Sequence, residues 1–286
     1  MDYDTGDLTA CPREPIRAGF GRGLVTAGRR DHSVLALCAD LTESTQMHLF
    51  RAEFPERFIE VGVAEQNLVT VAAGLARAGR IPFTSSYAAF SPGRNWEQIK
   101  TTAALNDLPV KIVGSHTGIN VGPDGATHQM LEDIALMRVL PNMVVVAPAD
   151  SVEAEKATVA TAANGKPTYL RLARAATPVF TSPAATFELG RAYLLRQGKT
   201  VSIVCSGTMT YHALVAAERL ATRGILADVL HCPTIKPLDQ DAVLASSART
   251  RCVVTVEEAQ IAAGLGGAVA ELLSERLPTR LRRVGI

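Results

Sequence analysis

The chain has 286 residues, 47% of them hydrophobic, and a formal net charge of +1 at pH 7. This length is ample for two domains with separate cores, and the balanced charge gives no basis for binding nucleic acid through bulk charge. No apolar run approaches the roughly 20 residues that span a bilayer, and the acidic N-terminus is not a signal peptide. The cysteines are scattered without a CxxC pair, which is typical of a reduced compartment. We expect a soluble, cytoplasmic protein that contacts neither nucleic acid nor membrane.

Strand and helix patterns alternate through the first half of the chain, after a leader at residues 1–14. Buried apolar runs predict strands at 33–39, 81–84, 110–114, 143–146 and 168–172, with a further short strand beginning at Phe58. Apolar positions at helical spacing predict helices at 16–28, 47–54, 65–79, 95–105, 131–139 and 152–163. This alternation predicts a parallel sheet covered by helices.

A segment rich in Thr, Pro, Ser and Ala follows, and a smaller unit of the same kind comes after it. Its predicted strands are 200–205, 227–230 and 252–256, and its predicted helices are 210–222, 238–248 and 265–276. The fold class is therefore α/β with two domains, each a mostly parallel sheet covered by helices. The expected boundaries are a leader at 1–14, a first domain at 15–175, a linker at 176–188 and a second domain at 189–286.

Glu65 is the first candidate site residue. It opens the helix that follows the Phe58 strand and the Gly62 turn, so its carboxylate is expected at the carboxyl edge of the sheet. Open α/β sheets bind their ligands at that edge. A glutamate in a first helical turn can also simply complement the helix dipole.

Two further segments are candidates for a binding site. Tyr87 and Phe90 lie among small residues, where their rings could form a flat slot for an aromatic ligand or simply fill the core. The second segment is the glycine-rich loop that begins at Ser115. It contains His116 and Asp124 and is followed by His128. Histidines and an aspartate after a buried strand favour acid–base or oxyanion chemistry. A metal site is less favoured because no third ligand set has the usual spacing.

Together these segments resemble part of a transketolase. The resemblance rests on three segments in this order: Val-Gly-Val-Ala-Glu65-Gln-Asn, the Tyr87/Phe90 segment and Gly-Pro-Asp124-Gly-Ala-Thr-His128-Gln. The chain from about Arg17 onward resembles the second half of such an enzyme, a pyrimidine-binding domain followed by the C-terminal domain. The 1-deoxyxylulose-5-phosphate synthases share the Asp-Gly-x-Thr-His loop. The β subunits of 2-oxoacid dehydrogenases share the glutamate and the second domain.

The resemblance implies a cofactor, thiamine diphosphate, and assigns residues to it. Glu65 would hydrogen-bond the aminopyrimidine ring and favour the tautomer that removes the thiazolium proton. Phe90 would stack on the pyrimidine with Tyr87 beside it, and Asp40 would also bind the cofactor. The same resemblance makes Glu65, His128 and His116 the catalytic residues.

The resemblance also implies a site for a sugar phosphate. His128, Asp124 and His116 would contact hydroxyl or carbonyl oxygens of the ketose. The distal phosphate would be bound by His116 and three further residues, which are Arg17, Ser44 and Arg174. Arginine suits this role because its planar fork matches phosphate oxygens. Arg171 competes with Arg174 for the place of the second arginine.

The chain departs from the family in three ways. It contains no Gly-Asp-Gly, the family's anchor for diphosphate and metal. Its Ser91-Pro-Gly93 segment is one residue shorter than usual, and its second domain is expected to be short. We therefore expect no metal site in this chain. A separate N-terminal subunit would bind the diphosphate and hold most of the Mg²⁺ (or Ca²⁺), in a heterotetramer with two copies of each subunit.

The sequence thus predicts one subunit of a split transketolase that depends on thiamine diphosphate. It would transfer a two-carbon ketol unit from a ketose (phosphate) to an aldose acceptor. One alternative is a subunit similar to 1-deoxyxylulose-5-phosphate synthase or to a 2-oxoacid dehydrogenase β subunit. Gln129-Met-Leu-Glu-Asp, after the histidine loop, favours transketolase over the synthase. Another alternative is a non-catalytic domain that pairs with and regulates a full-length enzyme. The presence of Glu65, His116 and His128 argues against it.

Overall fold

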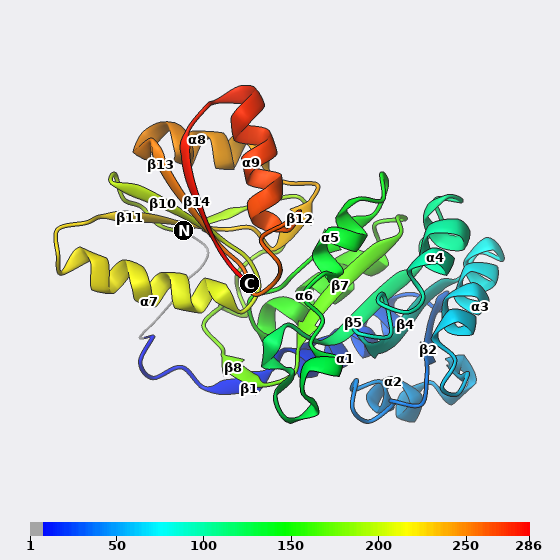
Figure 1. The fold of residues 1–286 in the computed structure, drawn as a ribbon. Helices are drawn as coiled ribbons and strands as arrows, with labels where there is room; N and C mark the ends of the chain where they lie inside the picture. The colour runs from blue at the N-terminus through cyan, green and yellow to red at the C-terminus, as the bar shows by residue number, and fades with distance from the viewer. Residues whose placement is uncertain (1–7) are drawn as a thin grey trace.

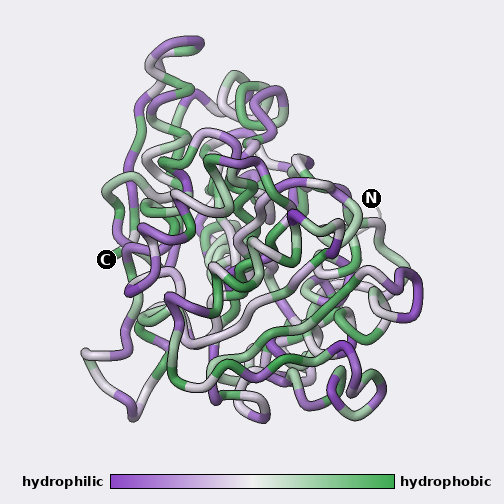
Figure 2. Tube along the Cα trace, turned by 90° about the vertical axis from the view of Figure 1, so that its right-hand side faces the viewer, coloured by the Kyte–Doolittle hydropathy of each residue, from purple (hydrophilic) through white to green (hydrophobic). Residues whose placement is uncertain are grey.

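The computed structural model describes residues 8–286 and shows two α/β domains, each with helices packed on a mostly parallel sheet (Figure 1). The predicted fold class is confirmed. Residues 1–7 of the predicted leader lie outside the described residues. Hydrophobic stretches gather in the interior of the trace, and hydrophilic residues lie mainly at its outer turns (Figure 2). No helix within residues 8–286 is both long and apolar enough to cross a bilayer.

The first sheet has seven strands in the order β12-β6-β7-β5-β4-β2-β3. Neighbouring strands are parallel except for β12, which is antiparallel to β6. Its strands are β2 (Val34–Cys38), β3 (Phe58–Glu60), β4 (Ile81–Tyr87), β5 (Lys111–Thr117), β6 (Val144–Val146), β7 (Thr168–Ala173) and β12 (Thr234–Lys236). The strand β2 is apolar and buried at every position, as expected of a parallel strand covered on both faces.

Helices cover both faces of this sheet (Figure 1). One face is covered by α1 (Ile16–Arg30), α2 (His48–Glu53) and α6 (Ser151–Ala162). The other is covered by α3 (Glu65–Arg77), α4 (Trp96–Gln98), the π-helical segment Ile99–Ala104 and α5 (Asp133–Arg138). Glycine allows α1 and α6 to pack closely, because a Cβ atom on Gly19 would lie 1.7 Å from the carbonyl oxygen of Ser151.

The second sheet has five strands in the order β14-β13-β10-β11-β9, and only β9 is antiparallel to its neighbour. Its strands are β9 (Tyr193–Arg196), β10 (Val201–Cys205), β11 (Ala227–His231), β13 (Cys252–Val256) and β14 (Arg280–Val284). The helix α7 (Met209–Ala221) packs on one face. The helices α8 (Gln240–Thr250) and α9 (Leu265–Arg276) pack on the other, where their core is continuous with that of the first domain.

Several details differ from the sequence predictions. The strands β1 (Arg13–Pro15) and β8 (Ala176–Pro178) pair antiparallel where a leader and a linker without regular structure were expected. The strand β5 continues to Thr117, so His116 lies on a strand and not in the loop predicted to begin at Ser115. The polar run Ser-His-Thr carries no apolar strand signal, although all three residues are buried. No strand was predicted for β9 or β12.

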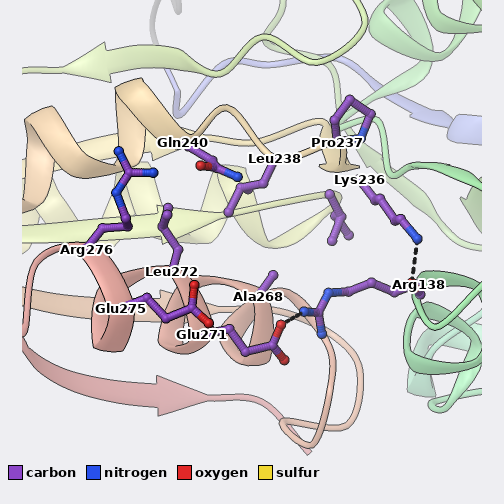
Figure 3. A pocket seen from close by; sticks show the side chains of 11 residues that line it. Arg138, Lys236, Pro237, Leu238, Gln240, Ala268, Glu271, Leu272, Glu275 and Arg276 are labelled. Carbon is purple, nitrogen blue, oxygen red and sulfur yellow. Dashed lines mark hydrogen bonds and ion pairs between the residues drawn. The ribbon is translucent and has the colours of Figure 1, made fainter. Parts of the chain in front are cut away.

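The two domains are joined through β12 and through side chains that cross between them. The hollow drawn in Figure 3 lies between the β12–α8 connection and α9, with Arg138 at one side. Arg138, at the end of α5, forms an ion pair with Glu271 of α9 and donates to the carbonyl oxygen of Ala263, 3.0 Å away. In return, Lys236 of β12 donates to the carbonyl oxygen of Arg138 at 2.9 Å. These contacts hold α5 against the second domain.

A fully buried ion pair also links the domains. Nε2 of His231, at the end of β11, lies 2.9 Å from Oε2 of Glu153 on α6. The hydroxyl of Thr210 is 2.8 Å from Nδ1 of His231. Burial lowers the pKa of His231, but the neighbouring Glu153 carboxylate and a hydrogen bond with Cys205 outweigh burial and raise the pKa to about 10. The imidazole is therefore a cation at neutral pH.

We expect His231→Gln to reduce the free energy of unfolding by about 3–5 kcal/mol at neutral pH, because the buried Glu153 carboxylate loses the cation that lies 2.9 Å from it. The folded-state pKa of His231 lies above its unfolded value of about 6.5. Its stabilisation is therefore complete below that value and is lost as the pH rises towards 10. Denaturant unfolding at several pH values tests this, with the exposed His212→Gln as control. A difference between His231→Gln and the wild type that does not shrink at high pH would contradict a charged His231.

Candidate active site

Polar and aromatic side chains gather at the edge of the first sheet where β2, β4, β5 and β7 end. These strands are parallel. Tyr87 lies opposite Ser115, and Thr117 lies opposite Ala173 after a register shift between Gly114 and Thr117. The helix α1 leads into β2 and runs antiparallel to it, so α1 begins at the same edge. Arg17 lies in the first turn of α1 and therefore also lies at this edge. Residues from distant parts of the chain therefore meet at one edge of the sheet.

Glu65 is the first residue of α3 and is only 2% exposed. Its Oε1 accepts a hydrogen bond from the Ser86 hydroxyl at 3.4 Å, and its Oε2 pairs with Nη1 of Arg94 at 3.1 Å. The Asn95 amide donates to the Glu65 carbonyl oxygen at 2.8 Å and fixes the start of the helix. A buried carboxylate is costly unless it is paired. Complementing a helix dipole does not require such burial, so the dipole alone does not explain the position of Glu65.

Arg94 is a site residue that the sequence analysis missed. Its guanidinium lies 4.9 Å from the centre of the Phe90 ring and also pairs with Glu65. The side chain is about half exposed, at 53%. No pattern in the sequence separates Arg94 from an ordinary surface arginine, because its two partners are brought together only by the fold.

Aromatic rings form a wall beside this carboxylate. The Tyr87 and Phe90 rings are nearly parallel, with centroids 6.2 Å apart. The His116 imidazole stacks on Tyr87 at 3.9 Å, and the His128 imidazole meets Phe90 edge-on at 5.3 Å. The structure thus brings together the two rings and the two histidines that the sequence singled out.

His116 is held in an unusual and strongly buried position. Its φ is +59°, in the left-handed region that non-glycine residues seldom adopt, and it is 2% exposed. Burial lowers the pKa of His116, the nearby charges of Arg17 and Arg174 lower it further, and the result is about 3. The imidazole is therefore neutral at physiological pH. Its Nδ1 lies 2.9 Å from the Ser115 hydroxyl.

Two arginines lie side by side next to His116. Nη1 of Arg17 donates to the carbonyl oxygen of Arg174, and Nη1 of Arg174 donates to the carbonyl oxygen of Val121 at 2.6 Å. Burial lowers the pKa of Arg17, and the charge of Arg174 lowers it further. Within residues 8–286, Nε of Arg17 is among the buried atoms that have no hydrogen-bond partner. Two close cations with a spare buried donor are suited to an anion.

Three predicted site residues remain, and they differ in whether they contact the side chains around His116. The Ser44 hydroxyl is 2.8 Å from the Tyr87 hydroxyl. Asp124 is half-buried, and its charge acts on His116. Asp40 is exposed, and its N–H donates to Oε1 of Glu60 at 2.8 Å. Within the described part of the chain, Asp40 is not among the side chains that contact one another here.

Arg171 is committed to the domain interface. It is buried, pairs with Asp133 at 2.8 Å and donates to the Glu258 carbonyl oxygen at 2.8 Å. Of the two arginines that competed for the anion, Arg174 is the one that lies beside Arg17 and His116. Among residues 8–286, no cluster of three or more His, Cys, Asp or Glu side chains could hold a metal ion.

Comparison with known protein families matches nearly the whole chain. Residues 15–179 match the family "Transketolase, pyrimidine binding domain". Residues 190–286 match the family "Transketolase, C-terminal domain". The two matches lie end to end, in the order that the sequence predicted.

The matches with individual relatives span most of the length of both proteins. A "Putative transketolase C-terminal section" of Methanocaldococcus jannaschii is 44% identical over 274 residues, 95% of this chain and 86% of the relative. A "6-deoxy-6-sulfo-D-fructose transketolase subunit" of Clostridium sp. (strain MSTE9) is 44% identical over 92% of this chain and 82% of the relative. The solved structure "Split gene transketolase, inactive beta4 tetramer" superposes with a TM-score of 0.89 at 43% identity, covering 95% of this chain and 89% of that one.

We expect the His116 imidazole to stay neutral from about pH 8 down to about pH 4, because its folded-state pKa lies far below the usual value of about 6.5. In Arg17→Ala the pKa of His116 should rise, since one of the charges that depress it is removed. NMR titration of ¹³C-labelled histidine, with His116→Gln for assignment, measures both. A His116 resonance that titrates near pH 6.5 in the wild-type chain would show that the imidazole is solvated.

Proposed function

The chain belongs to the transketolase family, and from this premise we propose that it is the pyrimidine-binding and C-terminal subunit of a split, two-chain transketolase. The observation that carries the proposal is the buried Glu65 carboxylate, which is linked to the Phe90 ring through Arg94. The relatives that match over more than four-fifths of their own length are named as a C-terminal section and as a subunit. The reaction would transfer a two-carbon ketol unit from a ketose to an aldose.

The residues present fit the pyrimidine end of thiamine diphosphate. An aminopyrimidine needs a flat apolar surface and a carboxyl group for its ring nitrogen, and Phe90 and Glu65 offer these two features. When bound, thiamine diphosphate supplies the electron sink for the carbanion formed by ketol cleavage. Glu65 would hold a proton at one carboxyl oxygen and exchange it with the ring nitrogen.

His116 and His128 would handle the oxygens of the substrate. His116 is neutral, so it can donate or accept a hydrogen bond without first losing a proton. Nδ1 of His128 lies 2.8 Å from the Thr127 hydroxyl, which leaves Nε2 for a hydroxyl or carbonyl oxygen. Asp124 would accept a hydrogen bond from a substrate hydroxyl. Tyr87 packs under His116 and sets the angle of its ring.

Arg17 and Arg174 would bind an anion at the far end of the ketose, with Ser44 and His116 beside them. The spare Nε of Arg17 supports this assignment, because a buried donor without a partner is costly unless a ligand accepts from it. One relative is named for a sulfonated sugar, and sulfonate and phosphate both present several anionic oxygens. The proposed donor is therefore a ketose with a phosphate or a similar anion.

A second chain would complete the enzyme. This chain has no Gly-Asp-Gly, so a diphosphate-binding N-terminal subunit would hold the diphosphate and the Mg²⁺ or Ca²⁺. The solved relative is described as an inactive tetramer of β chains. We propose that this chain likewise needs its partner for activity, in a heterotetramer with two copies of each subunit.

We expect Glu65→Gln to slow proton exchange at the thiazolium carbon by about 10²–10⁴-fold, because the amide cannot share a proton with the pyrimidine. Hydrogen–deuterium exchange of the cofactor, measured in the complex with the N-terminal subunit, gives this rate. The exposed Glu97→Gln is the matched control and should behave as the wild type. An unchanged exchange rate in Glu65→Gln would mean that Glu65 is only a helix-end residue.

We expect Arg17→Ala and Arg174→Ala each to lower kcat/KM for a phosphorylated ketose by about 10–100-fold, because a charge-assisted hydrogen bond is lost. Erythrulose is neutral and too short to reach the arginines, so its kcat/KM should change little. Steady-state kinetics of the complex with both donors tests this, with Arg30→Ala at the other end of α1 as control. Equal losses for both donors would show that these arginines are structural.

A further inference from the structure

The loop that carries Asp124 and His128 has little regular structure of its own. It runs from the end of β5 to the start of α5 and contains two short 3-10 turns, 119–124 and 126–128. Its glycines adopt positive φ angles, and one isolated bridge between Gly118 and Met130 closes its base. Few backbone hydrogen bonds fix such a loop. Its position must therefore be set by contacts with the rest of the protein.

The second domain supplies two of these contacts. Glu258, two residues after β13, accepts a hydrogen bond at Oε1 from the Asn120 N–H at 2.8 Å. The Gln260 N–H donates to the Leu131 carbonyl oxygen at 2.9 Å. A Cβ atom on Gly118 would lie 2.5 Å from Oε1 of Glu258, so the backbone of the loop rests directly on this carboxylate. The segment from Glu258 to Gln260 thus holds both ends of the loop.

Glu258 is itself held from two sides. Its Oε2 accepts a hydrogen bond from the Thr208 hydroxyl at 3.0 Å, at the start of α7. Its carbonyl oxygen accepts from Nη2 of Arg171, whose Nε is paired with the buried Asp133. The Tyr169 hydroxyl donates to the same Asp133 carboxylate at 2.7 Å. Glu258 therefore has little freedom to move, which suits a group that locates another segment.

The position of the loop also affects Arg174 and Arg17, the proposed anion-binding arginines. The Val121 carbonyl oxygen, one residue after Asn120, accepts the hydrogen bond from Nη1 of Arg174. The carbonyl oxygen of Arg174 in turn accepts from Arg17. A shift of Asn120 would therefore move one acceptor of Arg174 as well as Asp124 and His128.

We propose that Glu258 is a positioning residue, through which the second domain fixes the loop so that Asp124, His128 and Arg174 face the ketose. Its side chain is hydrogen-bonded to Asn120 and Thr208, so Glu258 would act on the three through Asn120 and Val121. The second domain provides no predicted substrate ligand, so through this contact it would act on substrate binding indirectly. The inference that the loop faces a ketose rests on the proposed function, whereas the inference that Glu258 anchors the loop does not.

Hydrogen exchange of the full chain, followed by mass spectrometry, tests the anchoring without any activity. In Glu258→Ala, peptides that span 118–131 should exchange about tenfold faster, because a charged acceptor of the loop is lost. Glu258→Gln keeps a carbonyl oxygen for the Asn120 N–H and should restore most of the protection. Glu271→Ala removes a different ion pair between the domains and should leave the loop unchanged.

Unchanged exchange of 118–131 in Glu258→Ala would overturn the proposal. So would a rise of equal size across α7 and α9, because Glu258 would then support only the second domain. In the complex with the N-terminal subunit, Glu258→Ala should raise KM for a phosphorylated ketose about tenfold, lower kcat less, and be rescued by Glu258→Gln. A loss in kcat alone would count against positioning. A wild-type complex without ketol transfer would refute the proposed function and leave the exchange result standing.

Discussion

The parallel register of the first sheet is the constraint on which the site depends. In a parallel sheet the carboxyl ends of all strands lie at one edge, so residues far apart in the chain meet there without long loops. Tyr87, His116 and Arg174 come from three strand ends, and the pairing of β4, β5 and β7 brings them together. Arg17 joins them because α1 must return antiparallel to β2. The strand pairing of the sheet thus determines which side chains lie close enough to form a common site.

Charge is distributed unevenly along this edge. At one end Glu65 is buried and paired with Arg94. At the other end Arg17 and Arg174 lie close together, and burial and their charges keep the neighbouring His116 neutral. Two like charges at close range disfavour the folded state unless an anion or buried dipoles compensate them. Carbonyl oxygens of Arg174 and Val121 supply part of that compensation, and in the proposed function an anionic ligand would supply the rest.

Sequence analysis predicts where these side chains lie when local pattern and chemistry coincide. The strand, turn and helix around Glu65 are all local, and so are the paired rings of Tyr87 and Phe90. It fails where a role depends on a distant partner. Arg94 and Glu258 look like ordinary surface charges until the fold brings Glu65 and Asn120 to them. The polar end of β5 has no strand signal, because its burial comes from neighbours far away in the chain.

Buried polar contacts explain why the second domain can hold a loop of the first. The ion pair His231–Glu153 joins the two domains. Arg171, which pairs with Asp133 inside the first domain, donates to the Glu258 carbonyl oxygen of the second. A buried ion pair contributes little net stability, but separating it leaves an uncompensated charge that costs about 3–5 kcal/mol. The His231–Glu153 pair and the hydrogen bond from Arg171 to Glu258 therefore oppose sliding or rotation of one domain against the other. A carboxylate on the second domain can then locate the Asn120 N–H as accurately as a residue of the first domain could.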